Sequence, residues 1–177
     1  MKDRKLLNIE LGRMSAQEYR HRPESGLVIV LDNVRSAHNV GSAFRSSDAF
    51  KVDKVVLCGI TAVPPSAEIH KSALGAELSV PFVHYDDTLE AVRDLKAAGY
   101  TVVSVEQTVS SVKLDKFSRK PGGRYAFIFG NEVDGVRQDV VDASDFSLEI
   151  PQYGTKHSLN VSVSVGIILW AATHPSI

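Results

Sequence analysis

The sequence has little cysteine, no long apolar run and almost no net charge, and each of these absences narrows what the protein can be. Its single cysteine, Cys58, cannot form an internal disulfide, which fits a cytoplasmic setting. No apolar run reaches membrane-spanning length, and the N-terminal sequence MKDRKLLNIELGRM mixes acids with bases, unlike a signal peptide. The formal net charge is −1, so any contact with nucleic acid must come from local basic patches.

The chain has the length and composition of one folded domain. Its 177 residues, 44% hydrophobic and 23% charged, favour a single domain with a sizeable core. We find no internal repeat, low-complexity tract or linker. Within the N-terminal residues 1–24, leucine and isoleucine side chains are interspersed with basic ones from position 4 to position 22, which predicts a helical arm. The arm could cover the core or a partner surface, or it could contact RNA.

Apolar runs separated by turn residues predict a set of buried strands. Residues 27–31, LVIVL, form a continuous apolar run, as expected for a strand buried on both faces. Further strands or apolar segments are predicted at 54–58, 78–84, 101–105, 125–129 and 146–150. Helices are predicted from about Asn39, and at 66–77, 88–98 and 138–143. This alternation predicts an α/β fold with a mostly parallel sheet and helices on both faces.

The C-terminal segment, residues 150–177, combines a polar–apolar alternation with a long apolar run. Serine and asparagine alternate with valine and leucine from position 158 to position 165, a pattern typical of a strand. The run nevertheless continues through Gly166 to Ala172, far beyond the usual length of a strand. We therefore predict a helix that begins near Ser158, with this serine as its N-cap.

Three polar loops follow predicted strands, at residues 32–45, 129–135 and 150–160. Ligands of open α/β sheets bind at the carboxyl ends of the strands, so we expect these loops to form a site. In the first loop, Arg45 could bind a phosphate or act on a proton, or it could form a surface salt bridge. In the second, the sequence FGNEVDG predicts a glycine turn that lets the backbone approach a small ligand.

Several other kinds of site are excluded by their missing motifs. No Gly-Lys-Ser/Thr follows the glycine turn, and no GxGxxG opens the first strand–helix connection, so neither a P-loop nor a dinucleotide site is predicted. The histidines lack paired spacing and Cys58 lacks a CxxC partner, which argues against a metal site. No GxSxG surrounds Ser158, which argues against a hydrolase.

Together, the three loops resemble the SpoU/TrmH family of RNA ribose 2′-O-methyltransferases, within the knotted SPOUT class. Three family motifs match in order: Asn-x-Gly-x-x-x-Arg at 39–45, Phe-Gly-x-Glu-x-x-Gly at 129–135, and Ile-Pro with Ser-Leu-Asn-Val-Ser at 150–151 and 158–162. The segment KSALGAE, residues 71–77, is also similar to family sequence. The resemblance runs from about residue 27 to residue 172, and three motifs at these separations are highly specific.

The resemblance implies an activity, a fold feature and partners. It implies S-adenosylmethionine as the methyl donor, a ribose 2′-hydroxyl of structured RNA (tRNA or rRNA) as the acceptor, and no metal. It also implies a deep trefoil knot formed by residues 150–177, an exception to the usual absence of knots. Family members are typically homodimers, so we expect each active site to be completed across the interface.

Carried over residue by residue, the resemblance also implies site residues. Arg45 is the candidate that activates the 2′-hydroxyl, although a pKa above about 12 makes arginine a poor base, and positioning of the transition state is an alternative role. The predicted catalytic set comprises Arg45, Asn39, Glu132, Ser158 and Asn160. The predicted cofactor-binding set comprises Gly130, Asn131, Glu132, Ile150, Ser158 and Leu159.

RNA contact is expected from a basic stretch, residues 113–124, with five basic residues and one acid. The residues predicted to bind RNA are Lys113, Lys116, Arg119 and Lys120. We expect the chain to lack the N-terminal RNA-binding domain of some members. Lys51 stands where many relatives have glycine, which predicts a changed turn.

Two alternatives to the enzyme remain open. The first is a non-catalytic RNA-binding relative with the same knot, against which the intact motif residues argue. The second is a methyltransferase for a base nitrogen, which the first motif disfavours.

Overall fold

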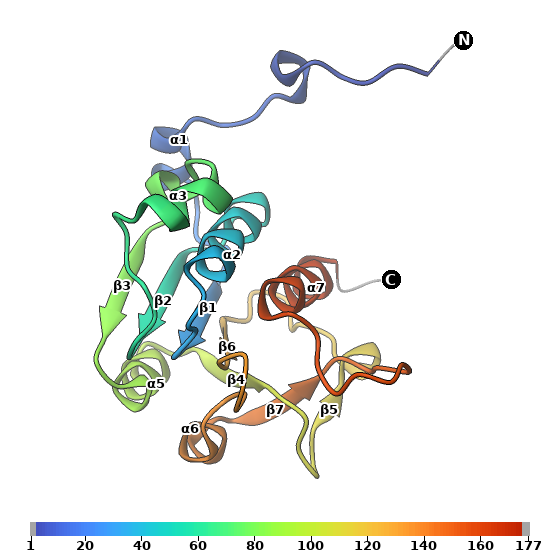
Figure 1. Ribbon diagram of the computed structural model, residues 1–177. Coiled ribbons are helices and arrows are strands. Elements are labelled where there is room, and N and C mark those ends of the chain that lie inside the picture. The colour runs from blue at the N-terminus through green and yellow to red at the C-terminus, as the bar shows by residue number, and fades with distance from the viewer. Residues whose placement is uncertain (1–2, 175–177) are drawn as a thin grey trace.

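The computed structural model describes residues 3–174, which contain a seven-stranded sheet in which every pair of neighbouring strands is parallel (Figure 1). The strand order is β3-β2-β1-β6-β4-β7-β5. The strands are β1 (Leu27–Asp32), β2 (Lys54–Cys58), β3 (Phe82–Tyr85), β4 (Thr101–Val105), β5 (Val112–Lys113), β6 (Tyr125–Phe129) and β7 (Phe146–Glu149). Because the strands are parallel, their carboxyl ends lie along one edge of the sheet.

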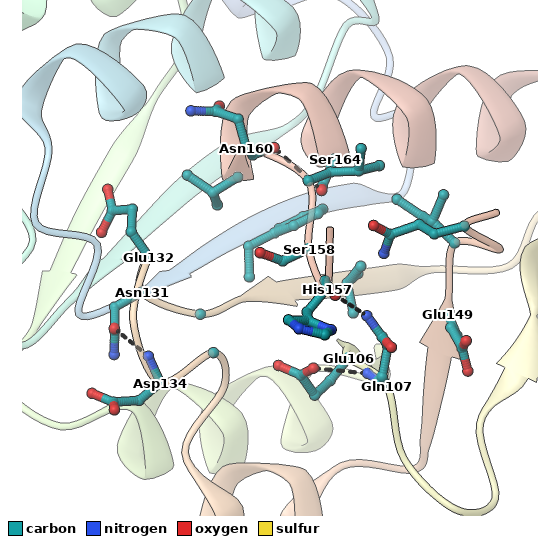
Figure 2. A pocket seen from close by; sticks show the side chains of 18 of the residues that line it. Glu106, Gln107, Asn131, Glu132, Asp134, Glu149, His157, Ser158, Asn160 and Ser164 are labelled. Carbon is teal, nitrogen blue, oxygen red and sulfur yellow. Dashed lines mark hydrogen bonds between the residues drawn. The ribbon is translucent and has the colours of Figure 1, made fainter. Parts of the chain in front are cut away.

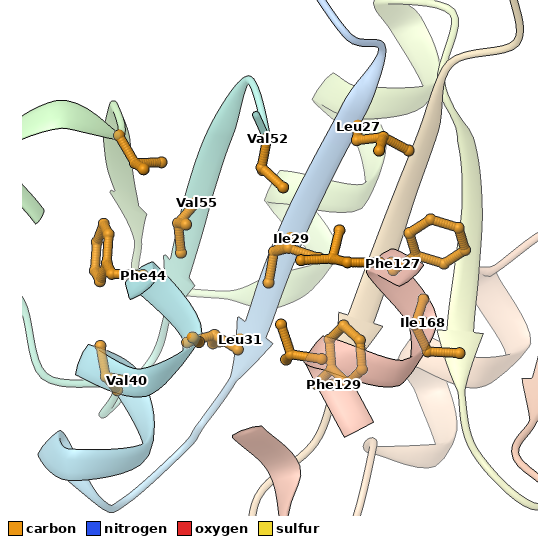
Figure 3. Close-up of a cluster of buried hydrophobic side chains, with 14 of the residues drawn as sticks. Leu27, Ile29, Leu31, Val40, Phe44, Val52, Val55, Phe127, Phe129 and Ile168 are labelled. Carbon is orange, nitrogen blue, oxygen red and sulfur yellow. The ribbon is translucent and has the colours of Figure 1, made fainter. Parts of the chain in front are cut away.

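Helices cover both faces of the sheet, and each face has its own hydrophobic core. One face packs against α1 (Ala16–His21), α2 (Ala37–Ala49), α3 (Ala67–Ala73), α4 (Ala76–Ser79) and α7 (Val161–Thr173). The other packs against α5 (Thr88–Ala97) and α6 (Gln138–Ala143). Alternate residues of β1 enter the two cores. Leu27, Ile29 and Leu31 face α2 and α7 (Figure 3), whereas Val28 and Val30 face α5. This two-sided burial explains the continuous apolar run of β1.

The predicted α/β class, with a parallel sheet between two helical layers, is confirmed. Three strands, β2, β4 and β6, have the predicted bounds, and α5 begins after the N-cap Asp87, whose side chain accepts a hydrogen bond from Leu89 N. α2 begins at Ala37 rather than near Asn39, because Ser36 is its N-cap. Within residues 3–174, no helix is long and apolar enough to cross a membrane.

The predicted start of the C-terminal helix is wrong. α7 begins at Val161, and its N-cap is Asn160, whose Oδ1 accepts a hydrogen bond from Ser162 N at 2.9 Å. Ser158 lies before the helix in an irregular segment. Asn160 also donates through Nδ2 to Asn39 Oδ1, so a contact with α2 fixes the residue at which the helix begins.

Other predictions are correct only in part. The N-terminal arm is not one helix: a 3-10 helix (Asn8–Leu11) ends at the left-handed Gly12, and α1 restarts after its own N-cap, Ser15. The helix predicted at 66–77 is split into α3 and α4 at Leu74 and Gly75, which both have positive φ. β5 and a 3-10 turn (Leu114–Lys116) lie where no element was predicted.

Lys51, where the sequence predicts a changed turn, follows the end of α2 in a conformation that glycine favours. Lys51 has a φ of 55°, the left-handed conformation for which glycine is suited. Its backbone N–H donates to Asp48 O at 3.1 Å, and Val52 N donates to Ser47 O at 2.9 Å. The lysine is therefore held in a glycine-like turn by the backbone hydrogen bonds that end α2.

Candidate active site

A cavity of about 460 Å³ lies where β4, β6 and β7 end (Figure 2). Its walls are segments 105–107 after β4, 129–135 after β6, 148–152 after β7 and 157–161 before and at the start of α7. All six residues of the predicted cofactor-binding set line this cavity: Gly130, Asn131, Glu132, Ile150, Ser158 and Leu159. The carboxyl-end rule therefore located the cavity, because parallel strands place these distant segments side by side.

The glycine turn after β6 closes on its own backbone. Asn131 and Gly135 exchange backbone hydrogen bonds at 3.2 Å, and Asn131 Oδ1 accepts from the backbone N–H groups of Val133 and Asp134. A Cβ atom on Gly130 would lie only 1.9 Å from the carbonyl carbon of Gly135. Glycine is thus required at position 130 by the close approach of backbone to backbone.

Glu132 joins the second motif to the first. Its carboxylate accepts hydrogen bonds from Arg35 N at 3.0 Å, Ser36 N at 3.1 Å and Asn39 Nδ2 at 2.8 Å. Burial alone would raise the pKa of Glu132, but these hydrogen bonds to the ionised form outweigh it and lower the pKa. The ionised carboxylate therefore fixes the 130–135 turn to the start of α2.

Asn39 extends this network to the third motif. Its Oδ1 accepts a hydrogen bond from Asn160 Nδ2 at 3.1 Å, and Asn160 is the N-cap of α7. The chain Glu132–Asn39–Asn160 thus links residues that are 93 and 121 positions apart in sequence. Three of the five predicted catalytic residues meet here, and Ser158 lines the adjoining cavity.

The Glu132 contacts make the stability of this junction depend on pH. Because the folded-state pKa of Glu132 lies below 4.5, its ordinary value, the stabilisation is fully present above that value and is lost as the pH falls through the lowered pKa. We expect Glu132→Gln to lower the free energy of unfolding at neutral pH, and the difference from wild type to shrink in acid. Denaturant unfolding from neutral pH down to about pH 3 measures this.

Glu68→Gln on α3 is the matched control, since it removes an exposed carboxylate whose side chain makes no hydrogen bond or ion pair within residues 3–174. If the difference in free energy of unfolding between wild type and Glu132→Gln stays constant in acid, ionisation of Glu132 does not hold the junction.

Two residues of the cavity wall were missed by the sequence reasoning. Glu106 Oε2 accepts a hydrogen bond from Val136 N at 3.0 Å. Gln107 Nε2 donates to His157 O at 2.7 Å (Figure 2). These two residues connect the 130–136 turn and the 157–160 segment to the end of β4. They directly follow the predicted strand 101–105, so the rule that located the other loops could have found them.

The cavity lining is acidic. Four carboxylate side chains contribute to it, from Glu106, Glu132, Asp134 and Glu149, whereas among the described residues His157 is the only one that lines it with a basic side chain. The carboxylate of Glu149 is paired with Lys113 and accepts from Ser111, and these hydrogen bonds lower its pKa. An excess of negative charge at a concave surface favours a ligand that carries positive charge.

Arg45 does not line this cavity. It lies on the exposed side of α2 and contributes to a second hollow, together with His38, Ser42, Lys71 and Ser162. Within residues 3–174 its guanidinium has no ion pair or hydrogen bond, so the surface salt bridge considered from the sequence is not found. One chain therefore assembles the predicted catalytic set only in part.

The predicted RNA-binding residues divide into two pairs. Lys113 is bound to Glu149, and the guanidinium of Arg119 donates to the carbonyl oxygens of Gly123 and Ser25. Burial lowers the pKa of Arg119. Lys116 and Lys120 are exposed and have no side-chain partner among the described residues. Half of the predicted set is thus occupied by contacts within the protein.

Comparison with known proteins gives a consistent family. The SpoU rRNA Methylase family matches residues 26–170. The chain is 38% identical over 151 residues to the 23S rRNA (guanosine-2′-O-)-methyltransferase RlmB of Nitrosomonas europaea, which covers 83% of this chain and 55% of that protein. It is 34% identical to RlmB of Vibrio vulnificus, covering 84% and 59%. The chain therefore spans a little over half the length of these curated relatives.

Solved structures show the same fold. An AdoMet-bound rRNA methyltransferase from Sinorhizobium meliloti superposes with a TM-score of 0.80 at 28% identity, covering 89% of this chain and 59% of that one. A TrmH/SpoU tRNA modifying enzyme of A. aeolicus superposes with a TM-score of 0.78 at 27% identity, covering 90% and 80%.

Proposed function

The chain belongs to the SpoU rRNA methylase family, and on this basis we propose that it transfers a methyl group from S-adenosylmethionine to a ribose 2′-hydroxyl of structured RNA. Ribosomal RNA is the proposed substrate class, because the names of the similar proteins from Nitrosomonas europaea and Vibrio vulnificus state 23S rRNA. The observation that carries the proposal is the cavity at the junction of the three motifs, with six predicted cofactor residues in its wall. We propose the cytoplasm as its compartment.

The residues of the cavity fit the proposed donor. A sulfonium centre and an ammonium group are both positive, which suits the acidic lining. Gly130 lets the 130–135 turn close on its own backbone in the cavity wall, and Ile150 and Leu159 offer apolar surface for an adenine ring. The volume lies within the range of small-molecule sites. When bound, the donor supplies the methyl group, and the protein holds it in place.

In the proposed mechanism, the protein acts mainly by positioning. The reaction is a nucleophilic displacement at the methyl carbon, for which alignment of the two reactants supplies much of the rate. Asn39, Glu132 and Asn160 hold the motif loops together, and Ser158 lines the donor cavity. Arg45 activates the 2′-hydroxyl or stabilises the charge that develops on it.

We further propose that the protein is a homodimer in which Arg45 completes the site of the other subunit. Arg45 lies outside the donor cavity of its own chain, which supports a composite site. The C-terminal helix also exposes large apolar side chains, with Trp170 51% and Val163 49% exposed, and such surface is typical of subunit interfaces.

The trefoil knot also remains a proposal. It is supported by the path of the chain after β7, which lies near one edge of the sheet next to β4 and β5. Residues 150–160 then lead back to α7, which packs against α2 and against buried side chains of β1 and β6. If this segment were threaded through a loop of the chain, the resulting knot would hold the return path in place.

The proposal is tested by donor uptake and by methyl transfer. Calorimetry should detect binding of S-adenosylmethionine or its demethylated product, and labelled methyl groups should appear on ribose 2′ oxygens of ribosomal RNA. Mapping 2′-O-methyl sites with and without the protein would identify the nucleotide. Absence of donor uptake would overturn the proposal, whereas RNA binding with donor uptake and no transfer would favour the non-catalytic alternative.

The basic stretch 113–124 gives a separate prediction for RNA binding. We expect the double substitution of Lys116 and Lys120 by alanine to weaken RNA binding and to reduce the slope of log affinity against log salt by about 1.4–1.8 for two lost phosphate contacts. Arg119→Ala should instead lower the thermal unfolding midpoint, because its guanidinium is bound to Gly123 and Ser25. Filter binding at several salt concentrations measures the slope. An unchanged slope in the double variant would show that the two lysines are exposed to solvent without contacting RNA.

A further inference from the structure

The second hollow, lined by Arg45, has a composition unlike that of the donor cavity. Three of its lining residues have basic side chains: Arg45, Lys71 and His38. Four others are serines, at positions 42, 46, 72 and 162, and none of its lining residues is acidic. One molecule thus has two neighbouring concave surfaces of opposite character, one acidic and one basic.

The cations of this hollow have no partner of their own. Within residues 3–174, neither the guanidinium of Arg45 nor the ammonium of Lys71 has an ion pair or a hydrogen bond, and the hydroxyl groups of Ser42 and Ser46 make no hydrogen bond either. By contrast, Arg22 and Arg20 are bound to groups of the protein. Unpaired cations beside free hydroxyl donors provide what a phosphate group accepts.

The placement of Lys71 beside α2 depends on a close helix contact. A Cβ atom on Gly41 would lie 2.1 Å from Ser72 Oγ and 2.3 Å from Ile69 O, so only glycine lets α3 approach α2 this closely. Gly41 lies one helical turn before Arg45, and Ser72 directly follows Lys71. Lys71 and Arg45 thus lie beside the close contact between α2 and α3, and both line the hollow.

The hollow adjoins the donor cavity through hydrogen-bonded residues. Ser162 lines the hollow, and its hydroxyl donates to Asn160 Oδ1 at 2.6 Å. Asn160 lines the donor cavity and is bonded to Asn39. The side chains of Ser162 and Asn160 thus join the lining of the hollow to the lining of the donor cavity.

We propose that this hollow binds a phosphodiester of the RNA backbone, with Lys71 as a phosphate-binding residue beside Arg45. The inference rests on the proposed function and names how the substrate is held. Lys71 supplies a point charge on a flexible stem, whereas Arg45 supplies a planar fork of donors. Holding the phosphate next to the reactive ribose would fix the position of the 2′-hydroxyl, which is the contribution that a displacement reaction needs.

The test compares Lys71→Met with Lys71→Arg, using a short single-stranded oligoribonucleotide of mixed sequence as the probe. Methionine keeps the apolar stem and removes the charge, and arginine restores the charge. We expect Lys71→Met to weaken binding and to reduce the slope of log affinity against log salt by about 0.7, the value for one lost phosphate contact to a single strand. Lys71→Arg should restore both the affinity and the slope. Lys54→Ala, which removes an equal charge at the amino end of β2, should leave the slope unchanged.

Two further measurements separate the possible outcomes. Lys71→Met should bind the donor with wild-type affinity in calorimetry, and in methyl transfer it should lower kcat/KM for RNA. A salt slope equal to that of Lys54→Ala would overturn the assignment of Lys71, even if the protein methylates RNA. If the wild-type protein takes up no donor, the proposed function fails, while the slope comparison still decides whether the hollow binds phosphate.

Discussion

Substitution of Arg45 by alanine should reduce methyl transfer by at least about 10²–10³-fold, the usual loss when a group that stabilises developing charge is removed. Donor affinity should stay close to that of the wild-type protein, because Arg45 lies outside the donor cavity. The variant should also fold normally, since the guanidinium is exposed and has no protein partner among the described residues. Single-turnover methyl transfer and donor calorimetry on the same sample measure the two effects separately.

Arg93→Ala is the matched control for Arg45→Ala. Arg93 is an exposed arginine on α5, which covers the opposite face of the sheet, and within residues 3–174 its only ion pair is a 3.8 Å contact with Glu90. Arg45→Lys keeps the charge and loses the planar fork, so partial activity would point to a role in charge stabilisation. Wild-type turnover in Arg45→Ala would remove this residue from the mechanism.

The composite-site proposal adds a stronger form of this test. Mixing Arg45→Ala with a variant that cannot bind donor should restore some activity, because one subunit of a mixed dimer would have both an intact cavity and an intact arginine from its partner. No recovery on mixing, with dimers shown to exchange, would place Arg45 in the site of its own chain.

Substitution of Gly130 by alanine should cost most of the donor affinity. The added Cβ would lie 1.9 Å from the carbonyl carbon of Gly135 and 2.1 Å from Val136 N, and backbone atoms cannot move aside as a side-chain end can. Overpacking of this kind costs about 1–3 kcal/mol. The 130–135 turn must shift to relieve it, and we expect donor affinity to fall by about ten- to a hundredfold. Calorimetric titration with S-adenosylmethionine measures the loss.

Gly154→Ala provides the control for Gly130→Ala. Gly154 belongs to the 150–160 loop, yet a Cβ atom there would have no neighbour within 4 Å, so the same chemical change should leave donor affinity intact. Thermal unfolding distinguishes a displaced turn from an unfolded protein. If Gly130→Ala binds donor as tightly as Gly154→Ala, the turn is not part of the donor site.

The elements that were predicted correctly are those whose signal is local. β2, β4 and β6 are short apolar runs bounded by turn residues, and α5 has both an N-cap at Asp87 and a stop at Gly99. In each case the decisive side chains lie within a few residues of the element, so the burial pattern or the cap can be read directly from the sequence.

The elements that were predicted poorly depend on distant contacts. Ser158 and Asn160 are both good N-caps, and the local sequence favours neither clearly. Asn160 is selected because its amide also bonds to Asn39, 121 residues away in the chain. The basic stretch 113–124 shows the same limit, because Lys113 and Arg119 are bound by Glu149, Gly123 and Ser25 rather than left free for RNA.

The sequence alone determined the α/β class, the loops at the carboxyl ends of the strands and the family, because periodicity and motif spacing are properties of the linear chain. Only the tertiary structure decided that Glu132, Asn39 and Asn160 form one network, that Glu106 and Gln107 complete the cavity wall, and that Arg45 shares a basic hollow with Lys71. The reason is physical. The packing of α2 between α3 and α7 sets the distances between side chains that are far apart in sequence, and the strength of electrostatic interactions depends on those distances.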